Sequence, residues 1–160
     1  MPKFIKKFIK HIDWKNFKRF FIILQCGSII FGVIFSVIQL RDVRNMQSAE
    51  LMLTFNEYLG SETNFKIITL IENNQPILIE NGGKFSSAEL DNYLSTLELL
   101  SNVYFNRLIT DDMLYNAFDY TIIKTYQNKE ITDYLKKIRQ EDPMFFMGFE
   151  SLAISLSMVE

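Results

Sequence analysis

The chain has 160 residues, enough for one ordinary domain plus an anchoring segment. Residues 1–19 carry seven Lys/Arg against one acid, a net charge of +6, whereas residues 41–160 carry ten Lys/Arg against eighteen Asp/Glu, a net charge of −8. An acidic domain does not neutralise phosphates, so the charge excludes direct nucleic-acid binding by residues 41–160. The single cysteine, Cys26, excludes a disulfide within the chain.

Residues 1–19 form a basic N-terminal arm. On a helix of about 100° per residue, Phe4, Ile5, Phe8, Ile9 and Ile12 fall in one sector, and the opposite sector holds Lys3, Lys6, Lys7 and Lys10. This pattern predicts a helix lying in the surface of an anionic leaflet, with Trp14 at the headgroup level. The alternative is a basic flank whose apolar residues have no common role.

Residues 20–40 are 21 consecutive residues without a charge. As a helix they extend about 32 Å, close to the thickness of a bilayer's hydrocarbon core. A buried core helix of this length usually has a charged face, and a cleaved signal peptide has a shorter apolar region ending in a small-residue site. Arg41-Asp42 follows Leu40 instead. The sequence therefore predicts an uncleaved transmembrane helix.

The distribution of positive charge predicts the orientation of this helix. Seven Lys/Arg precede residues 20–40, and only Arg41 and Arg44 follow closely. Cytoplasmic flanks of membrane helices carry the excess of Lys/Arg. We therefore expect a single-pass protein of the cell membrane, with its N-terminus in the cytoplasm and residues 45–160 outside the cytoplasm.

A polar and small-residue seam runs along the same segment. Its members fall within about 80° on a helical projection and are Gln25, Ser28, Gly32, Ser36 and Gln39. Small residues four apart let helices approach closely, and amides in lipid favour a polar partner over hydrocarbon. The seam predicts self-association of the transmembrane helix.

Start and stop signals predict six helices in residues 41–160, the acidic domain. The first runs from Arg41 to Leu59, and Ser61 is expected to cap the second, which ends near Asn73. Pro76 and Gly82-Gly83 mark an irregular stretch, in which Ile77, Leu78 and Ile79 are expected to pack inside. The four later helices are expected to begin at the Ser86–Glu89 capping box, Thr110, Asn128 and Asp142-Pro143. Phe145, Phe149, Leu152, Ala153 and Leu156 form the expected buried stripe of the last helix.

These patterns predict an all-α fold, in which one transmembrane helix is followed by a small helical bundle. Residues 85–156 also resemble an uncharacterised family of small bacterial proteins with one N-terminal span and a helical domain. The stretches that carry the resemblance are Tyr93–Glu98, Asp111-Asp112 with Phe118, Ile131–Leu135 followed by Arg139, and Phe149–Leu152. The resemblance implies a fold class and a membrane location. It implies no activity, because the family has none established.

Residue types that carry catalysis are scarce in the acidic domain. The only histidine, His11, lies in the basic arm, so the domain cannot form Cys/His or Ser/His/Asp nucleophilic sites or a Cys/His zinc site. Glu98 and Glu150 lie near apolar positions, where a carboxylate needs a partner, and Arg139 is a candidate partner for one of them. A carboxylate acid–base pair is the alternative interpretation. We expect a structural ion pair, no metal, no cofactor and no enzymatic activity.

Two functions fit these observations. The first is a membrane-anchored interaction module, whose helical domain binds a protein partner or a second copy while the arm contacts anionic lipid headgroups. The alternative is an effector acting on the membrane itself, such as a toxin or a cell-defence component, through the basic arm and the transmembrane helix.

Overall fold

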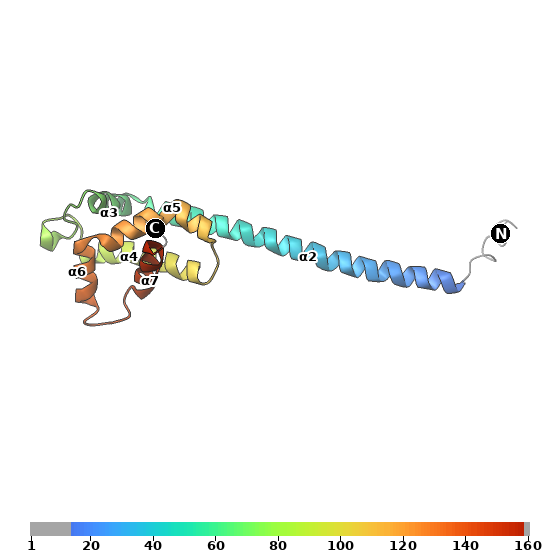
Figure 1. Ribbon diagram of the computed structural model, residues 1–160. Coiled ribbons are helices and arrows are strands. Elements are labelled where there is room, and N and C mark those ends of the chain that lie inside the picture. The colour runs from blue at the N-terminus through green and yellow to red at the C-terminus, as the bar shows by residue number, and fades with distance from the viewer. Residues whose placement is uncertain (1–13, 159–160) are drawn as a thin grey trace. The chain divides into compact units, whose positions relative to one another are not determined.

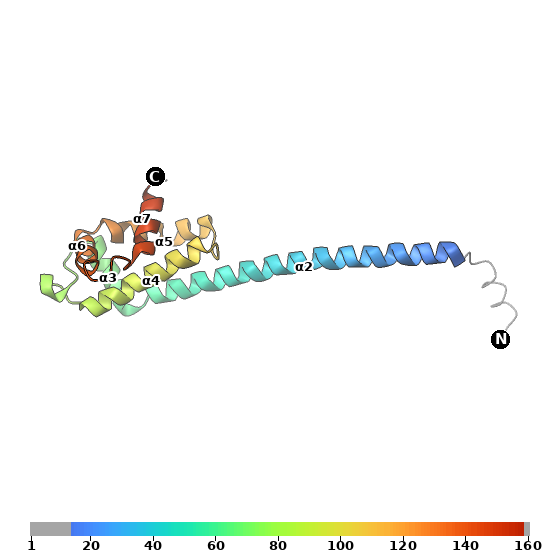
Figure 2. The same cartoon turned by 90° about the horizontal axis from the view of Figure 1, so that it is seen from below.

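The computed structural model describes residues 14–158, with side chains from residue 17. All regular elements in this described part are helices, which confirms the all-α prediction. The chain divides into two compact units, Met1–Asn45 and Met46–Glu160 (Figures 1 and 2).

The first described helix, α2, runs from Trp14 to Leu59. Its large apolar side chains between Phe20 and Leu40 have exposed fractions of 52% to 76%. The helix is long and apolar enough to cross a membrane. No helix breaker lies between residues 20 and 40 except Gly27 and Gly32, which a continuous helix tolerates in an apolar environment.

The second unit begins within α2 and continues through five further α-helices. These are α3 (Glu62–Glu72), α4 (Ser87–Phe105), α5 (Asp111–Gln127), α6 (Lys129–Ile138) and α7 (Met147–Ser157). A short 3₁₀ helix, η1 (Ile79–Asn81), lies in the segment between α3 and α4. Figure 1 shows α5 continuing almost directly into α6, whereas a longer loop joins α6 to α7.

The core of the second unit forms where α7 packs against α4 and α5, with α3 against the same two helices. Apolar residues at helical spacing point inward, and the fully buried ones include Leu90, Leu94, Leu97, Leu114, Ile122, Phe149 and Leu152. Burying one such side chain contributes about 1.5–3 kcal/mol. The predicted stripe of the last helix is correct at Phe149, Leu152, Ala153 and Leu156.

One polar contact lies inside this core. The Tyr93 hydroxyl lies 2.7 Å from Thr125 Oγ1, and Thr125 in turn donates to the Thr121 carbonyl at 2.7 Å. Both Tyr93 and Thr125 are fully buried, so the contact satisfies polar atoms that water cannot reach. Burial raises the pKa of the Tyr93 hydroxyl well above its ordinary value.

Three predicted helix starts are confirmed by their hydrogen bonds. Ser86 and Glu89 form the capping box, with the Ser86 N–H donating to Glu89 Oε2 at 2.8 Å and the Glu89 N–H donating to Ser86 Oγ at 3.3 Å. The Ser86 N–H, followed by the Ser86 hydroxyl, which donates to the same Glu89 oxygen at 2.8 Å, lowers the pKa of Glu89. Thr110 accepts from Met113 N at the start of α5, and Asn128 accepts from the backbone at the start of α6.

The predicted start of the last helix at Asp142-Pro143 is wrong. Asp142 Oδ1 accepts from the Met144 N–H at 2.9 Å, which closes a local turn instead of a helix, and α7 begins only at Met147. Phe145 consequently leaves the predicted buried stripe and is 43% exposed. A carboxylate before a proline suits both a helix start and a turn, so the sequence signal was ambiguous.

Two smaller expectations also fail. Ser61 precedes α3, but its side chain makes no capping bond, and the nearby Asn64 side chain donates to the Tyr58 carbonyl instead. Ile77 and Leu78 are buried as expected, whereas Ile79 is 64% exposed because η1 turns it outward.

Candidate functional site

The predicted seam residues all lie on α2. Gln25, Ser28, Gly32, Ser36 and Gln39 are exposed, and their helical spacing places them within about 80° of one another. The Ser36 hydroxyl donates to the Gly32 carbonyl at 2.8 Å, which satisfies its donor within the helix. A Cβ placed on Gly32 would meet nothing within 4 Å, so the glycine leaves the backbone open to close approach.

Most of the predicted arm residues precede the described part of the chain. Trp14 is the first residue of α2. Lys3, Lys6, Lys7, Lys10 and His11 lie outside the described residues, so the predicted surface helix stays a prediction.

Arg139 and Glu150 form an ion pair. Arg139 Nη1 lies 2.5 Å from Glu150 Oε2, and the two side chains are only 21% and 27% exposed. The Tyr126 hydroxyl donates to Glu150 Oε1 at 3.2 Å. Partial burial, followed by the Glu150 charge, raises the pKa of Tyr126. Glu150 therefore accepts hydrogen bonds from two side chains, Arg139 and Tyr126.

Glu98 is not a member of this pair. Its two carboxylate oxygens accept from the backbone N–H groups of Gly148 at 3.1 Å and Phe149 at 2.6 Å. Glu98 lies on α4, so it caps the N-terminus of α7 from a distant part of the chain, where the helix dipole favours a negative charge. A Cβ on Gly148 would lie 2.5 Å from Ser101 Oγ and 2.7 Å from Glu98 Oε1, so this close approach requires glycine.

Arg139 also holds the loop that precedes α7. Its Nε donates to the Phe145 carbonyl at 2.9 Å and its Nη2 to the Phe146 carbonyl at 3.2 Å. Phe146 is buried and has φ 54° and ψ 33°, a left-handed conformation that an aromatic residue rarely adopts. Such strain persists only where surrounding contacts determine the backbone, and here Arg139 and Glu98 provide them.

The held loop presents three apolar side chains to solvent. They are Met144 at 70%, Phe145 at 43% and Met147 at 41% exposed, and we name them the apolar tip. Sequence reasoning missed the tip, because Pro143 followed by apolar residues was interpreted as a buried helix. The signal that could have revealed it is the run of four large apolar residues, Met144–Met147, which exceeds what one helix face can bury.

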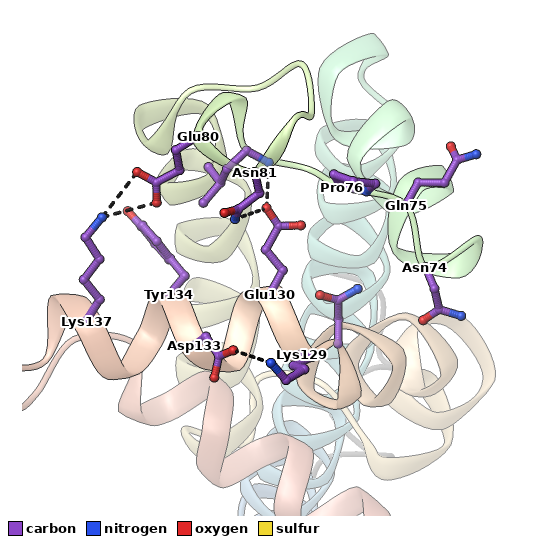
Figure 3. Close-up of a pocket in the computed structure, with 12 residues that line it drawn as sticks. Asn74, Gln75, Pro76, Glu80, Asn81, Lys129, Glu130, Asp133, Tyr134 and Lys137 are labelled. Carbon is purple, nitrogen blue, oxygen red and sulfur yellow. Dashed lines mark hydrogen bonds and ion pairs between the residues drawn. The ribbon is translucent and has the colours of Figure 1, made fainter.

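A polar cleft of about 490 Å³ lies between α6 and the segment that connects α3 to η1 (Figure 3). Glu130, from the first turn of α6, points into it. One Glu130 oxygen accepts from the Ile77 N–H at 2.8 Å, and the other accepts from the Leu78 N–H at 2.9 Å and the Asn81 side chain at 2.7 Å. Glu130 therefore clamps a connection between two helices.

The other charged groups of the cleft are engaged with each other. Lys137 pairs with Glu80 at 3.2 Å, as Figure 3 shows, and Lys129 pairs with Asp133 at 3.2 Å. The Tyr134 hydroxyl donates to Asp91 Oδ1 at 2.7 Å. Burial, followed by the bond to Asp91, raises the pKa of Tyr134 far above its ordinary value. These contacts stabilise the wall of the cleft and leave Tyr134 as a neutral donor.

The described side chains form no recognisable catalytic arrangement. Across residues 14–158, no group of three or more His, Cys, Asp or Glu residues could hold a metal ion. No protein-family model, curated protein or solved structure matches this chain. The resemblance to small single-span bacterial proteins therefore stays a prediction.

Proposed function

We propose that the chain is a single-pass membrane protein whose helical domain is an interaction module. The observation that carries this proposal is the exposure of the apolar residues of α2 between Phe20 and Leu40, at 52% to 76% each. Leaving such a side chain in water forgoes roughly 1.5–3 kcal/mol relative to burial. A bilayer covers all of these side chains at once. It offers no hydrogen-bond partners, but the helix needs none there because its backbone groups are bonded to one another.

The charge distribution sets the orientation of this module in the membrane, and the α2 seam brings copies of it together. The basic arm contacts anionic headgroups on the cytoplasmic side, and the acidic domain extends from the opposite face, as the positive-inside rule requires. Copies meet in the bilayer through the seam of Gln25, Ser28, Gly32, Ser36 and Gln39. Confinement to the membrane raises the effective concentration of the domain for its partner.

The engagement of the ionisable residues supports binding over catalysis. Glu98 and Glu130 accept backbone N–H groups, and Glu150 accepts from Arg139 and Tyr126. Carboxylates in such contacts position helices and loops, which gives the domain a fixed surface. Fixed surfaces lose little entropy on association.

Extraction from membranes tests the anchor. Wild-type protein should stay with membranes in alkaline carbonate, whereas Ile30→Lys with Phe31→Lys should be released. Each central lysine opposes insertion by about 2.5–3.5 kcal/mol. The matched control, Met158→Lys in the second unit, should be retained. Release of the wild-type protein would refute the proposal, and a reporter fused after Glu160 should report an extracytoplasmic position.

Disulfide crosslinking tests the seam. The background is Cys26→Ser, which removes the only cysteine. Ser28→Cys and Ser36→Cys should crosslink in native membranes, whereas Ile30→Cys, on the opposite face by helical spacing, should not. Equal yields at all three positions would exclude the seam as an interface.

A further inference from the structure

The apolar tip lies on a backbone that side chains of α4 and of the end of α6 hold by hydrogen bonds. Arg139 bonds the carbonyls of Phe145 and Phe146, and Glu98 caps the helix that follows. In Figure 1 the loop between α6 and α7 runs along the edge of the second unit, outside the packed helices. Contacts that hold a strained backbone in place therefore also hold Met144 in an exposed position.

Acidic groups border the tip. Glu141 and Asp142 are exposed and precede the tip in the chain, separated from Met144 by Pro143. Arg139, which contacts the backbone of the tip, is paired with Glu150 at 2.5 Å, and on α6 Lys136 pairs with Asp133 at 3.5 Å and Lys137 with Glu80 at 3.2 Å. The surface is thus apolar at its centre and negative at its margin.

We propose that the apolar tip docks a cationic amphipathic helix of a partner protein. This rests on the proposed function and names the partner of the interaction module. The tip side chains pack on the apolar face of the partner, and methionine adapts its shape to the residues it meets. Glu141 and Asp142 face the partner's Lys and Arg residues, and the net charge of the domain, −8, accelerates the encounter.

The same charges disfavour two other occupants. An anionic lipid surface is repelled by Glu141 and Asp142. A second copy brings an equally acidic domain, so two tips facing each other place four carboxylates at one contact. A cationic helix alone satisfies both the apolar centre and the negative margin.

A peptide titration tests the proposal on the full chain in nanodiscs of zwitterionic lipid. The probe is a fluorescent amphipathic peptide of about 20 residues made of Leu and Lys, which should bind with a measurable Kd. Met144→Ser with Phe145→Ser should weaken binding roughly tenfold, and Glu141→Gln should weaken it by about threefold at low salt. Met144→Lys, at a site 70% exposed, should weaken binding without affecting the fold.

Matched controls separate the tip from general acidity. Met158→Ser removes an apolar side chain that is 79% exposed elsewhere, and Glu57→Gln removes a distant exposed charge. Both should bind the peptide as the wild type does, and a Leu/Glu peptide should not bind. Equal affinity of tip and control variants for the peptide would overturn the proposal. Binding of the tip to vesicles of anionic lipid, without binding to the peptide, would also overturn it. Carbonate retention of the same variants is measured in membranes, so failure of docking is distinguished from failure of the anchor.

Discussion

Replacing Arg139 by methionine tests how the loop before α7 is held. Methionine keeps an unbranched apolar stem, so the substitution removes charge and hydrogen bonds more than packing. Two bonds to the carbonyls of Phe145 and Phe146 are lost, each contributing about 1 kcal/mol net. The ion pair with Glu150 contributes a further 1–2 kcal/mol or so, less than a fully buried pair because the side chains are 21% and 27% exposed.

We therefore expect Arg139→Met to lower the free energy of unfolding of the second unit by about 3–4 kcal/mol. That is a large part of the roughly 5–15 kcal/mol typical of a domain. The assay is urea unfolding of the full chain in detergent, followed by circular dichroism, with amide hydrogen exchange at Phe149 and Glu150 to locate the change. Both amides should exchange faster in the variant, because the loop no longer positions α7.

Two further variants make the reasoning refutable. Adding Glu150→Met to Arg139→Met should recover about 1 kcal/mol, since the double variant leaves no partly buried carboxylate without its cation. The control Lys129→Met, which breaks an exposed pair with Asp133, should leave the unfolding curve unchanged. If Arg139→Met behaved like Lys129→Met, the loop would not depend on Arg139.

Three other outcomes are expected from the same unfolding assay. Tyr93→Phe should destabilise by about 1 kcal/mol at pH 7 through the lost hydroxyl contact. The raised pKa of Tyr93 means that the unfolded chain ionises first, so wild-type stability should fall as pH rises above about 10, and Tyr93→Phe should weaken this fall. Glu130→Ala should lower the free energy of unfolding by about 2–4 kcal/mol, because it leaves the N–H groups of Ile77 and Leu78 without their acceptor. Those two amides should then exchange fast, and slow exchange would contradict the clamp. Gly83→Ala should lower the free energy of unfolding by about 3 kcal/mol, because its Cβ would lie 2.3 Å from the Ile77 carbonyl. Gly82→Ala, at a position of positive φ with open space around it, should lower it by about 1 kcal/mol. The reverse order would contradict the packing.

Signals between residues close together in the sequence were sufficient to predict most of the helices. The length of the apolar stretch predicted the long exposed helix, and side-chain caps at Ser86, Thr110 and Asn128 predicted three helix starts. These signals succeed because both the cap and the groups it satisfies lie within four residues. The stripe of α7 was predictable for the same reason, since its period depends only on helical geometry.

Contacts between distant residues could not be predicted in the same way. Glu98 meets the start of α7 some fifty residues later, and Glu130 meets Ile77 across a similar separation. The sequence showed that Glu98 needed a partner, but Arg139 and the backbone of α7 were equally suitable partners. The start of α7 was misplaced because Asp142 Oδ1 accepts from the Met144 N–H in a local turn, and a carboxylate before a proline suits a turn as well as a helix start.

The central position of α7 also has a consequence for biosynthesis. The buried apolar residues of α4 and α5, the two helices that contact α7 most, leave the ribosome before Phe149 and Leu152 of α7 exist. A nascent chain that ends before residue 147 therefore carries an open apolar groove. Proteins that shield hydrophobic surfaces during translation should bind such truncated chains and release them once α7 is added.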